Sequence, residues 1–295
     1  MRRRAAQRRP GDAARPGGPA DQHRLPRPPR RRPGPPPRHP RPRPPADRRP
    51  LLVTLAPSAL AAPGTIFTER GLQPHPVPRA LETAEVPSVI EEFARAARAA
   101  VEAGLDGVEL HAAGGYLPHQ FLDPSSNRRT DAYGGSAAAR ARFVVEAAEA
   151  MAAAIGGERV GIRVSPAANL HGAVEDDPAE TAATYRALLD GIAPLGLACL
   201  HTIGDPAGPL LAGPRARFGG PVIVNDGWHA MTDEPTARRR VASGQADLVS
   251  AGRAFIANPD LVRRRREHAP IAEPDPATFY GGGARGYNGH SARPE

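Results

Sequence analysis

Lysine is absent from this chain of 295 residues, so its 39 basic residues are all arginine. The absence excludes any mechanism that needs a Schiff-base lysine. The single cysteine, Cys199, excludes an intramolecular disulfide framework. No apolar run approaches the roughly 18 residues of a membrane-spanning helix. We therefore expect a cytoplasmic protein with no membrane partner, and no residue pattern indicates a metal site.

The basic charge is concentrated at the N-terminus. Residues 1–50 contain 16 arginines, 15 prolines and only 3 acidic residues, whereas the rest of the chain is net acidic. Arginine and proline bury too little apolar area to offset the entropy cost of ordering a chain. We predict that residues 1–50 form a disordered Arg/Pro-rich tail.

Several interpretations of this tail remain open. It could bind nucleic acid or an acidic partner by counterion release. A transit peptide is disfavoured because no serine precedes Ser58, and the Arg48–Arg49 pair lies too deep for a twin-arginine signal. Translation of GC-rich DNA out of frame yields arginine, proline, alanine and glycine. A frameshift or a wrongly assigned start is the interpretation we favour, and nucleic acid is then not a partner.

From Pro87 onward, the pattern of apolar residues alternates between helix and strand. Helices are predicted to begin near residues 87, 136, 177, 234 and 257, with side-chain caps at Ser136 and Asp177. Strands are predicted over 107–111, 159–164, 197–203, 221–225 and 247–251. Residues 51–86 are predicted to be an irregular loop segment. Alternation of this kind predicts an α/β fold with a parallel sheet and right-handed crossovers.

Polar residues and glycines recur where the predicted strands end. They are His111, Arg163, His201, Asn225 and Gly252. Ligands of parallel α/β sheets bind at the carboxyl ends of the strands. The sequence therefore predicts a polar pocket at this edge.

Two turns that follow the last two strands suit an anion. Asp226-Gly227 and Gly252-Arg253 contain glycine, which lets the backbone approach a phosphate closely. The second turn leads into a predicted helix, whose free N–H groups favour negative charge. A plain turn is the alternative in both places.

Five motifs in consecutive order resemble those of the old yellow enzyme family, the FMN-dependent ene reductases. They span residues 56–60, 109–136, 160–166, 250–261 and 279–287. The resemblance covers residues 51–295 and implies that this segment corresponds to strands four to eight of the family barrel. It predicts an incomplete (β/α)8 TIM barrel, with residues 87–295 as a partial flavin oxidoreductase domain.

In this family FMN is reduced by NADPH or NADH and passes hydride from flavin N5 to an activated alkene. By resemblance, His111 binds the electron-withdrawing oxygen of the substrate, where negative charge develops. By the same resemblance, Tyr116 corresponds to the family's proton donor to the α-carbon. A phenol is protonated at neutral pH and can act as a general acid. The structural alternatives are a core histidine and an aromatic residue on the barrel rim.

The resemblance also assigns residues to the cofactor. Arg163 would face flavin N1 and O2, with a salt bridge inside the barrel as its alternative. The phosphate would be held at Asp226, Gly227, Gly252 and Arg253. Tyr280 would form a wall of the substrate pocket. His201 and Cys199 are expected to be packing residues.

The chain departs from the family pattern in ways that argue against full activity. The family has His or Asn three residues after the first histidine, where this chain has Gly114. Loss of one such donor typically costs about 10²–10³ in rate. The first three barrel strands have no counterpart, so two open sheet edges could allow self-association. The alternatives are an inactive remnant, a nucleic-acid or acidic-partner binder acting through the tail, and a different phosphate-binding barrel enzyme.

Overall fold

The computed structural model describes most of the chain after residue 52. The described residues are 53–68, 70–204, 216–227, 233–279, 284, 286, 288–290 and 292. The Arg/Pro-rich tail and Tyr280, for which predictions were made, lie outside them. In the described part, no helix is long and apolar enough to cross a lipid bilayer.

Five parallel strands form the central sheet in the order β5-β6-β7-β8-β9. Their bounds are Val108–Ala112, Val160–Val164, Cys199–Ile203, Val222–Asn225 and Leu248–Val249. Each coincides with a predicted strand, so the α/β prediction is confirmed. Within the described residues, β5 and β9 each pair with one neighbour of this sheet.

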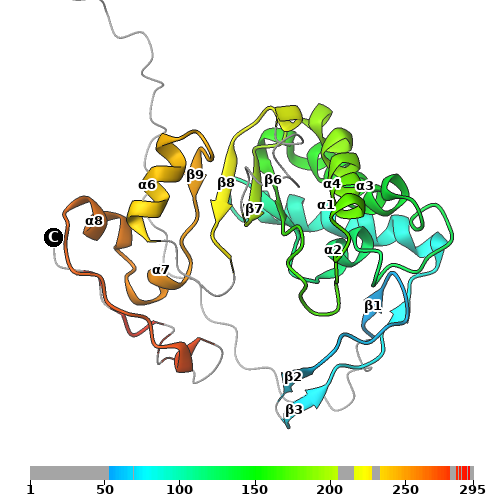
Figure 1. Cartoon of the computed structure of the whole chain (residues 1–295), viewed down its shortest axis with the longest axis horizontal. Coiled ribbons are helices and arrows are strands. Elements are labelled where there is room, and N and C mark those ends of the chain that lie inside the picture. Colours follow the sequence, from blue (N-terminus) through cyan, green and yellow to red (C-terminus); the bar gives the residue numbers. More distant parts are fainter. Residues whose placement is uncertain are drawn as a thin grey trace, which may run out of the picture. The chain divides into compact units, whose positions relative to one another are not determined.

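Four longer helices accompany these strands, and α3 packs against both α1 and α4, while α6 contacts β9. They are α1 Val86–Glu102, α3 Ala137–Ile155, α4 Pro178–Ile192 and α6 Glu234–Ala242. In Figure 1, α1, α3 and α4 lie on the same side of β6 and β7. Both predicted caps are confirmed: Ser136 accepts a hydrogen bond from the N–H of Ala139, and Asp177 accepts those of Ala179 and Glu180.

The structure differs from the sequence-based expectation at three places. The polar loop after β5 contains a short helix, α2, at Leu117–Leu122, which is too brief to show helical periodicity. The single helix predicted from residue 257 is instead two, α7 Arg253–Ala257 and α8 Leu261–Arg266. Pro259 lies between them, and the buried Asn258 accepts the N–H of Ala272 there at 2.9 Å. A proline lacks the N–H that a continuous helix needs.

The third difference concerns residues 53–86, where no regular element was predicted. Four short strands occur there, β1 Leu55–Ala56, β2 Thr65–Thr68, β3 Gly71–Pro74 and β4 Arg79–Ala80. β2 and β3 pair as an antiparallel hairpin, and β1 pairs with β4 in parallel. Single helical turns occupy Thr83–Glu85, Gly157–Arg159, Ala193–Leu195 and Pro276–Thr278.

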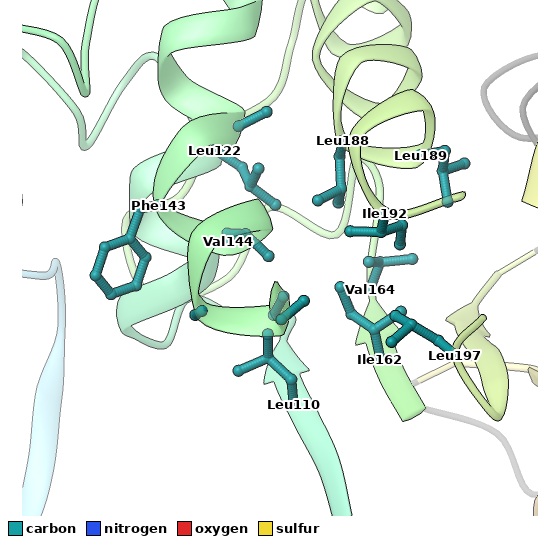
Figure 2. Packing of buried hydrophobic residues seen from close by; sticks show 14 of the residues in the cluster. Leu110, Leu122, Phe143, Val144, Ile162, Val164, Leu188, Leu189, Ile192 and Leu197 are labelled. Carbon is teal, nitrogen blue, oxygen red and sulfur yellow. The ribbon is translucent and has the colours of Figure 1, made fainter. Parts of the chain in front are cut away.

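The hydrophobic core lies between the sheet and the helices (Figure 2). Alternate residues of β5, β6, β7 and β8 supply it, among them Leu110, Ile162 and Val164, which are at most 1% exposed. Leu188 and Ile192 of α4 are fully buried against them. Burying one such side chain contributes about 1.5–3 kcal/mol. Because side chains alternate along a strand, the other face of the sheet carries the intervening residues, which are mostly polar.

Candidate functional site

Strand register aligns three of the five predicted strand-end residues in one row, while Asn225 lies opposite Ile203 and Gly252 lies beyond the end of β9. His111 on β5 lies opposite Arg163 on β6, which lies opposite His201 on β7. Partners in register point to the same face of a sheet. The three side chains therefore share the face opposite the hydrophobic core, close to the strand ends.

A hydrogen-bonded chain crosses this polar face. His201 Nδ1 lies 2.9 Å from Glu109 Oε2, and His201 Nε2 lies 3.0 Å from Ser250 Oγ. Asn225 donates its side-chain N–H to Ser250 Oγ at 3.0 Å. His201 is buried, as a packing residue would be, but its two ring nitrogens link β5, β7 and β9. The sequence interpretation of His201 as simple packing therefore missed its polar role.

Glycine at position 161 makes this chain possible. Glu109 and His201 belong to strands that are separated by β6, and Gly161 is the residue of β6 opposite Glu109. A Cβ at Gly161 would lie 2.8 Å from Cys199 Sγ and 3.7 Å from Glu109 Cγ. Burial opposes ionisation of Glu109, but the hydrogen bond and charge of His201 bring its pKa below the ordinary value.

Arg163 contributes a positive charge and one hydrogen-bond donor that has no acceptor among the described residues. Its Nε is buried and has no hydrogen-bond partner in the described part of the chain. Burial lowers the pKa of Arg163, and the nearby Glu109 opposes that shift. A buried donor without an acceptor costs about 1–3 kcal/mol. The site therefore fits a ligand with an acceptor atom at this position.

His111 and Tyr116 lie together at the carboxyl end of β5. Their ring centroids are 5.1 Å apart and the rings are tilted by 50°. Burial and then the charge of Arg163 lower the pKa of His111, so the imidazole is neutral at pH 7 and donates one N–H. Tyr116 is 57% exposed, so its hydroxyl is accessible to a ligand above the strand end.

The turn between these two residues is held by side chains. Gly114 and Gly115 have φ angles of 64° and 78°, which glycine adopts without strain. Gly114 N–H donates to Ser165 Oγ at 2.9 Å, and its carbonyl lies 2.9 Å from His171 Nδ1. The sequence analysis predicted neither this turn nor its supporting residues, which come from the loop after β6.

The two predicted phosphate turns lie side by side. Asn225, the last residue of β8, and Ser250, which follows β9, lie just before the two turns, and their side chains are hydrogen bonded. Gly252 has open space where a Cβ would project, and Arg253 begins α7. Asp226 pairs with Arg240 at 2.6 Å, and Gly227 donates its N–H to Asn225 Oδ1 at 3.1 Å. Gly227 and Gly252 both have open space where a Cβ would project, one in each turn.

A cavity of about 980 Å³ opens beside Tyr116. Its walls come from residues 54–66, residues 75–78, the start of α2 and the loop after β6. His75, His171 and Arg128 contribute polar groups to an otherwise mainly apolar lining. Tyr280, the predicted wall of a substrate pocket, is outside the described residues.

Fold and geometry together define a parallel α/β protein with polar and ionisable side chains gathered near the carboxyl edge of its sheet. The chain belongs to the NADH:flavin oxidoreductase / NADH oxidase family, because the sequence model of that family matches residues 44–209. The old yellow enzyme resemblance is thereby confirmed.

Relatives and solved structures agree with this assignment. The chain is 42% identical over 241 residues to a probable flavin mononucleotide-dependent alkene reductase of Leishmania infantum, covering 79% of this chain and 65% of that protein. It is 42% identical over 213 residues to 12-oxophytodienoate reductase 1 of Oryza sativa subsp. japonica, covering 69% and 54%. The structure of morphinone reductase with tetrahydroNAD superposes with a TM-score of 0.74 at 43% identity, covering 82% and 67%. The chain thus spans between about half and two thirds of their lengths.

Proposed function

We propose that this chain binds FMN and acts as an NADPH- or NADH-dependent oxidoreductase of the ene-reductase type. The observation that carries the proposal is the buried Nε of Arg163, which no described residue hydrogen bonds and which lies in the same row as His111, next to the end of β5. This arrangement supplies a cation and a neutral imidazole where a flat, acceptor-rich ring would lie. The relatives named above support the same cofactor.

The proposed cofactor contacts follow from the residues present. Arg163 would donate to an acceptor edge of the flavin and stabilise negative charge there. The phosphate would lie at Gly252 and Arg253, with backbone groups of the Asp226-Gly227 turn beside it. Bound FMN would supply hydride transfer from N5 to the β-carbon of an activated alkene, after reduction by a nicotinamide.

The protein residues would orient the substrate and move one proton. His111 would donate its N–H to the carbonyl or nitro oxygen of the substrate, and this bond strengthens as charge develops on that oxygen. Tyr116 Oη would give a proton to the α-carbon and recover one from water. Tyr280 would complete the pocket. Small molecules with an activated alkene are the proposed substrates.

We also propose that the sheet represents strands four to eight of a (β/α)8 barrel. The strand order and the match to barrel relatives support this assignment. The unpaired edges of β5 and β9 would then favour association with another chain. Gly114 supplies no second donor to the substrate oxygen, so activity is proposed to be impaired, and an inactive remnant is the alternative.

The test is a titration of the purified full chain with FMN, followed by visible spectroscopy and flavin fluorescence. We expect saturable binding, bleaching of bound flavin by NADPH or NADH, and reoxidation by cyclohexenone. Binding without turnover would support the cofactor assignment and the proposed impairment. A protein that binds no FMN at 100 μM, about −5.5 kcal/mol on the affinity scale, would refute the enzyme proposal.

A further inference from the structure

We propose that His119 and Glu175 form a buried clamp that holds Tyr116 in position over His111. The inference rests on the proposed role of Tyr116 as proton donor, but it concerns residues that touch neither substrate nor cofactor. His119 is a positioning residue in this proposal. Its side chain is fully buried, and that of Glu175 is 1% exposed.

The clamp begins at the backbone group directly before Tyr116. Gly115 donates its N–H to His119 Nδ1 at 2.9 Å, in a buried contact. Its carbonyl accepts the side-chain N–H of Gln120 at 2.7 Å. Both polar groups of Gly115 are therefore held by side chains of α2. Because Gly115 is in the left-handed region at φ 78°, its neighbour Tyr116 depends on these bonds for its direction.

The bond from Gly115 also fixes the tautomer of His119. Since Nδ1 accepts a hydrogen bond, the proton of the neutral ring is on Nε2. Nε2 lies 3.5 Å from Glu175 Oε1, close enough for electrostatic attraction, and has no hydrogen-bond partner among the described residues. A buried N–H without an acceptor is costly, so the attraction of the nearby Glu175 carboxylate favours this orientation of the imidazole.

Glu175 anchors the clamp to the next strand. Its Oε2 accepts the N–H of Ala167 at 2.6 Å, in the loop that follows β6. Tyr185 of α4 also points its hydroxyl at this oxygen, at 3.5 Å, and burial raises the pKa of that phenol, so it stays protonated. One carboxyl group thus ties α2 to the β6 loop and to α4.

The experiment replaces His119 in two ways. His119→Leu removes the acceptor and leaves the Gly115 N–H unpaired, whereas His119→Asn places an amide oxygen near the position of Nδ1. Tyr133→Phe is the matched control, because it removes a side-chain hydrogen bond, to Glu146 at 2.8 Å, away from the turn. Amide exchange of Gly115 and the nuclear Overhauser effect between the Tyr116 and His111 rings need no flavin.

We expect the Gly115 amide to exchange at least about tenfold faster in His119→Leu than in wild type, because its buried acceptor is gone. The contact between the two rings should weaken in the same variant. His119→Asn and Tyr133→Phe should retain both signals. Unchanged protection of Gly115 and an unchanged ring contact in His119→Leu would overturn the proposal, whether or not the chain binds FMN.

Turnover separates the clamp from a general loss of structure. An enone needs a proton at its α-carbon after hydride addition, whereas a nitroalkene gives a nitronate that can leave unprotonated. His119→Leu should therefore slow enone reduction by about 10–100-fold, as expected for a displaced catalytic group, while nitroalkene reduction changes by less than about threefold. Equal losses on both substrates would contradict the positioning role. If Tyr116→Phe leaves enone reduction unchanged, the proton-donor assignment fails instead.

Discussion

The carboxylate of Glu109 and the imidazole of His201 lie 2.9 Å apart although their strands, β5 and β7, are not neighbours. The bond passes over β6 at Gly161, the one position on this face where β6 has no side chain between them. The polar network of the candidate site thus depends on the space that Gly161 leaves by having no side chain.

Gly161→Ala should therefore destabilise the protein. The new Cβ would approach Cys199 Sγ to 2.8 Å, so the thiol or the strand must shift. We expect a loss of about 1–3 kcal/mol in the free energy of unfolding, as for overpacked cores. Urea denaturation measures it. Gly289→Ala, which meets no atom within 4 Å, is the control and should stay within about 0.5 kcal/mol.

Arg163→Ala should weaken the binding of FMN. A charge-assisted hydrogen bond contributes about 1.5–3 kcal/mol, so we expect the dissociation constant to rise by about 10–100-fold in a fluorescence titration. Arg163→Lys should fall between wild type and alanine, because an ammonium keeps the charge but not the planar fork. Arg142→Ala, at an exposed position of α3, is the control. Equal affinities of Arg163→Ala and wild type would remove Arg163 from the site.

The lowered pKa of His111 predicts a pH dependence of stability. Below about pH 6.5 the unfolded chain binds a proton at His111 that the folded protein does not bind, because the folded pKa is depressed. Stability is therefore lost as pH falls from 6.5 to the folded pKa and is constant below it. His111→Asn should remove this contribution. The stability of wild type relative to His111→Asn should thus decrease between pH 7.5 and 5 in urea titrations. A constant difference would show that His111 titrates as in the unfolded chain.

Gly114→Asn should increase enone reduction if the missing donor limits the rate. The φ angle of 64° at Gly114 is one that asparagine tolerates better than most residues. A recovered oxyanion donor would raise the turnover number by up to about 10²-fold. Gly114→Ala imposes the strain without the amide and should not raise it. No gain in the asparagine variant, with folding retained, would count against Gly114 as the cause of impairment.

The sequence alone identified the family, five strands of the sheet and the row of residues at their ends. These follow from local information: apolar periodicity, capping residues such as Ser136, and motifs around His111 and Gly252. The sequence placed Arg163 and His111 at strand ends, whereas their common face follows from the strand register.

Only the tertiary structure decided how these residues are supported. Two contacts join segments that are distant in sequence, Glu109 with His201 and His119 with Glu175. Tyr116 directly precedes α2, a helix too short to show periodicity. Their distances depend on strand register and on where a glycine leaves room, which no local pattern encodes. That is why His201 looked like a packing residue in the sequence but forms part of a hydrogen-bonded network in the fold.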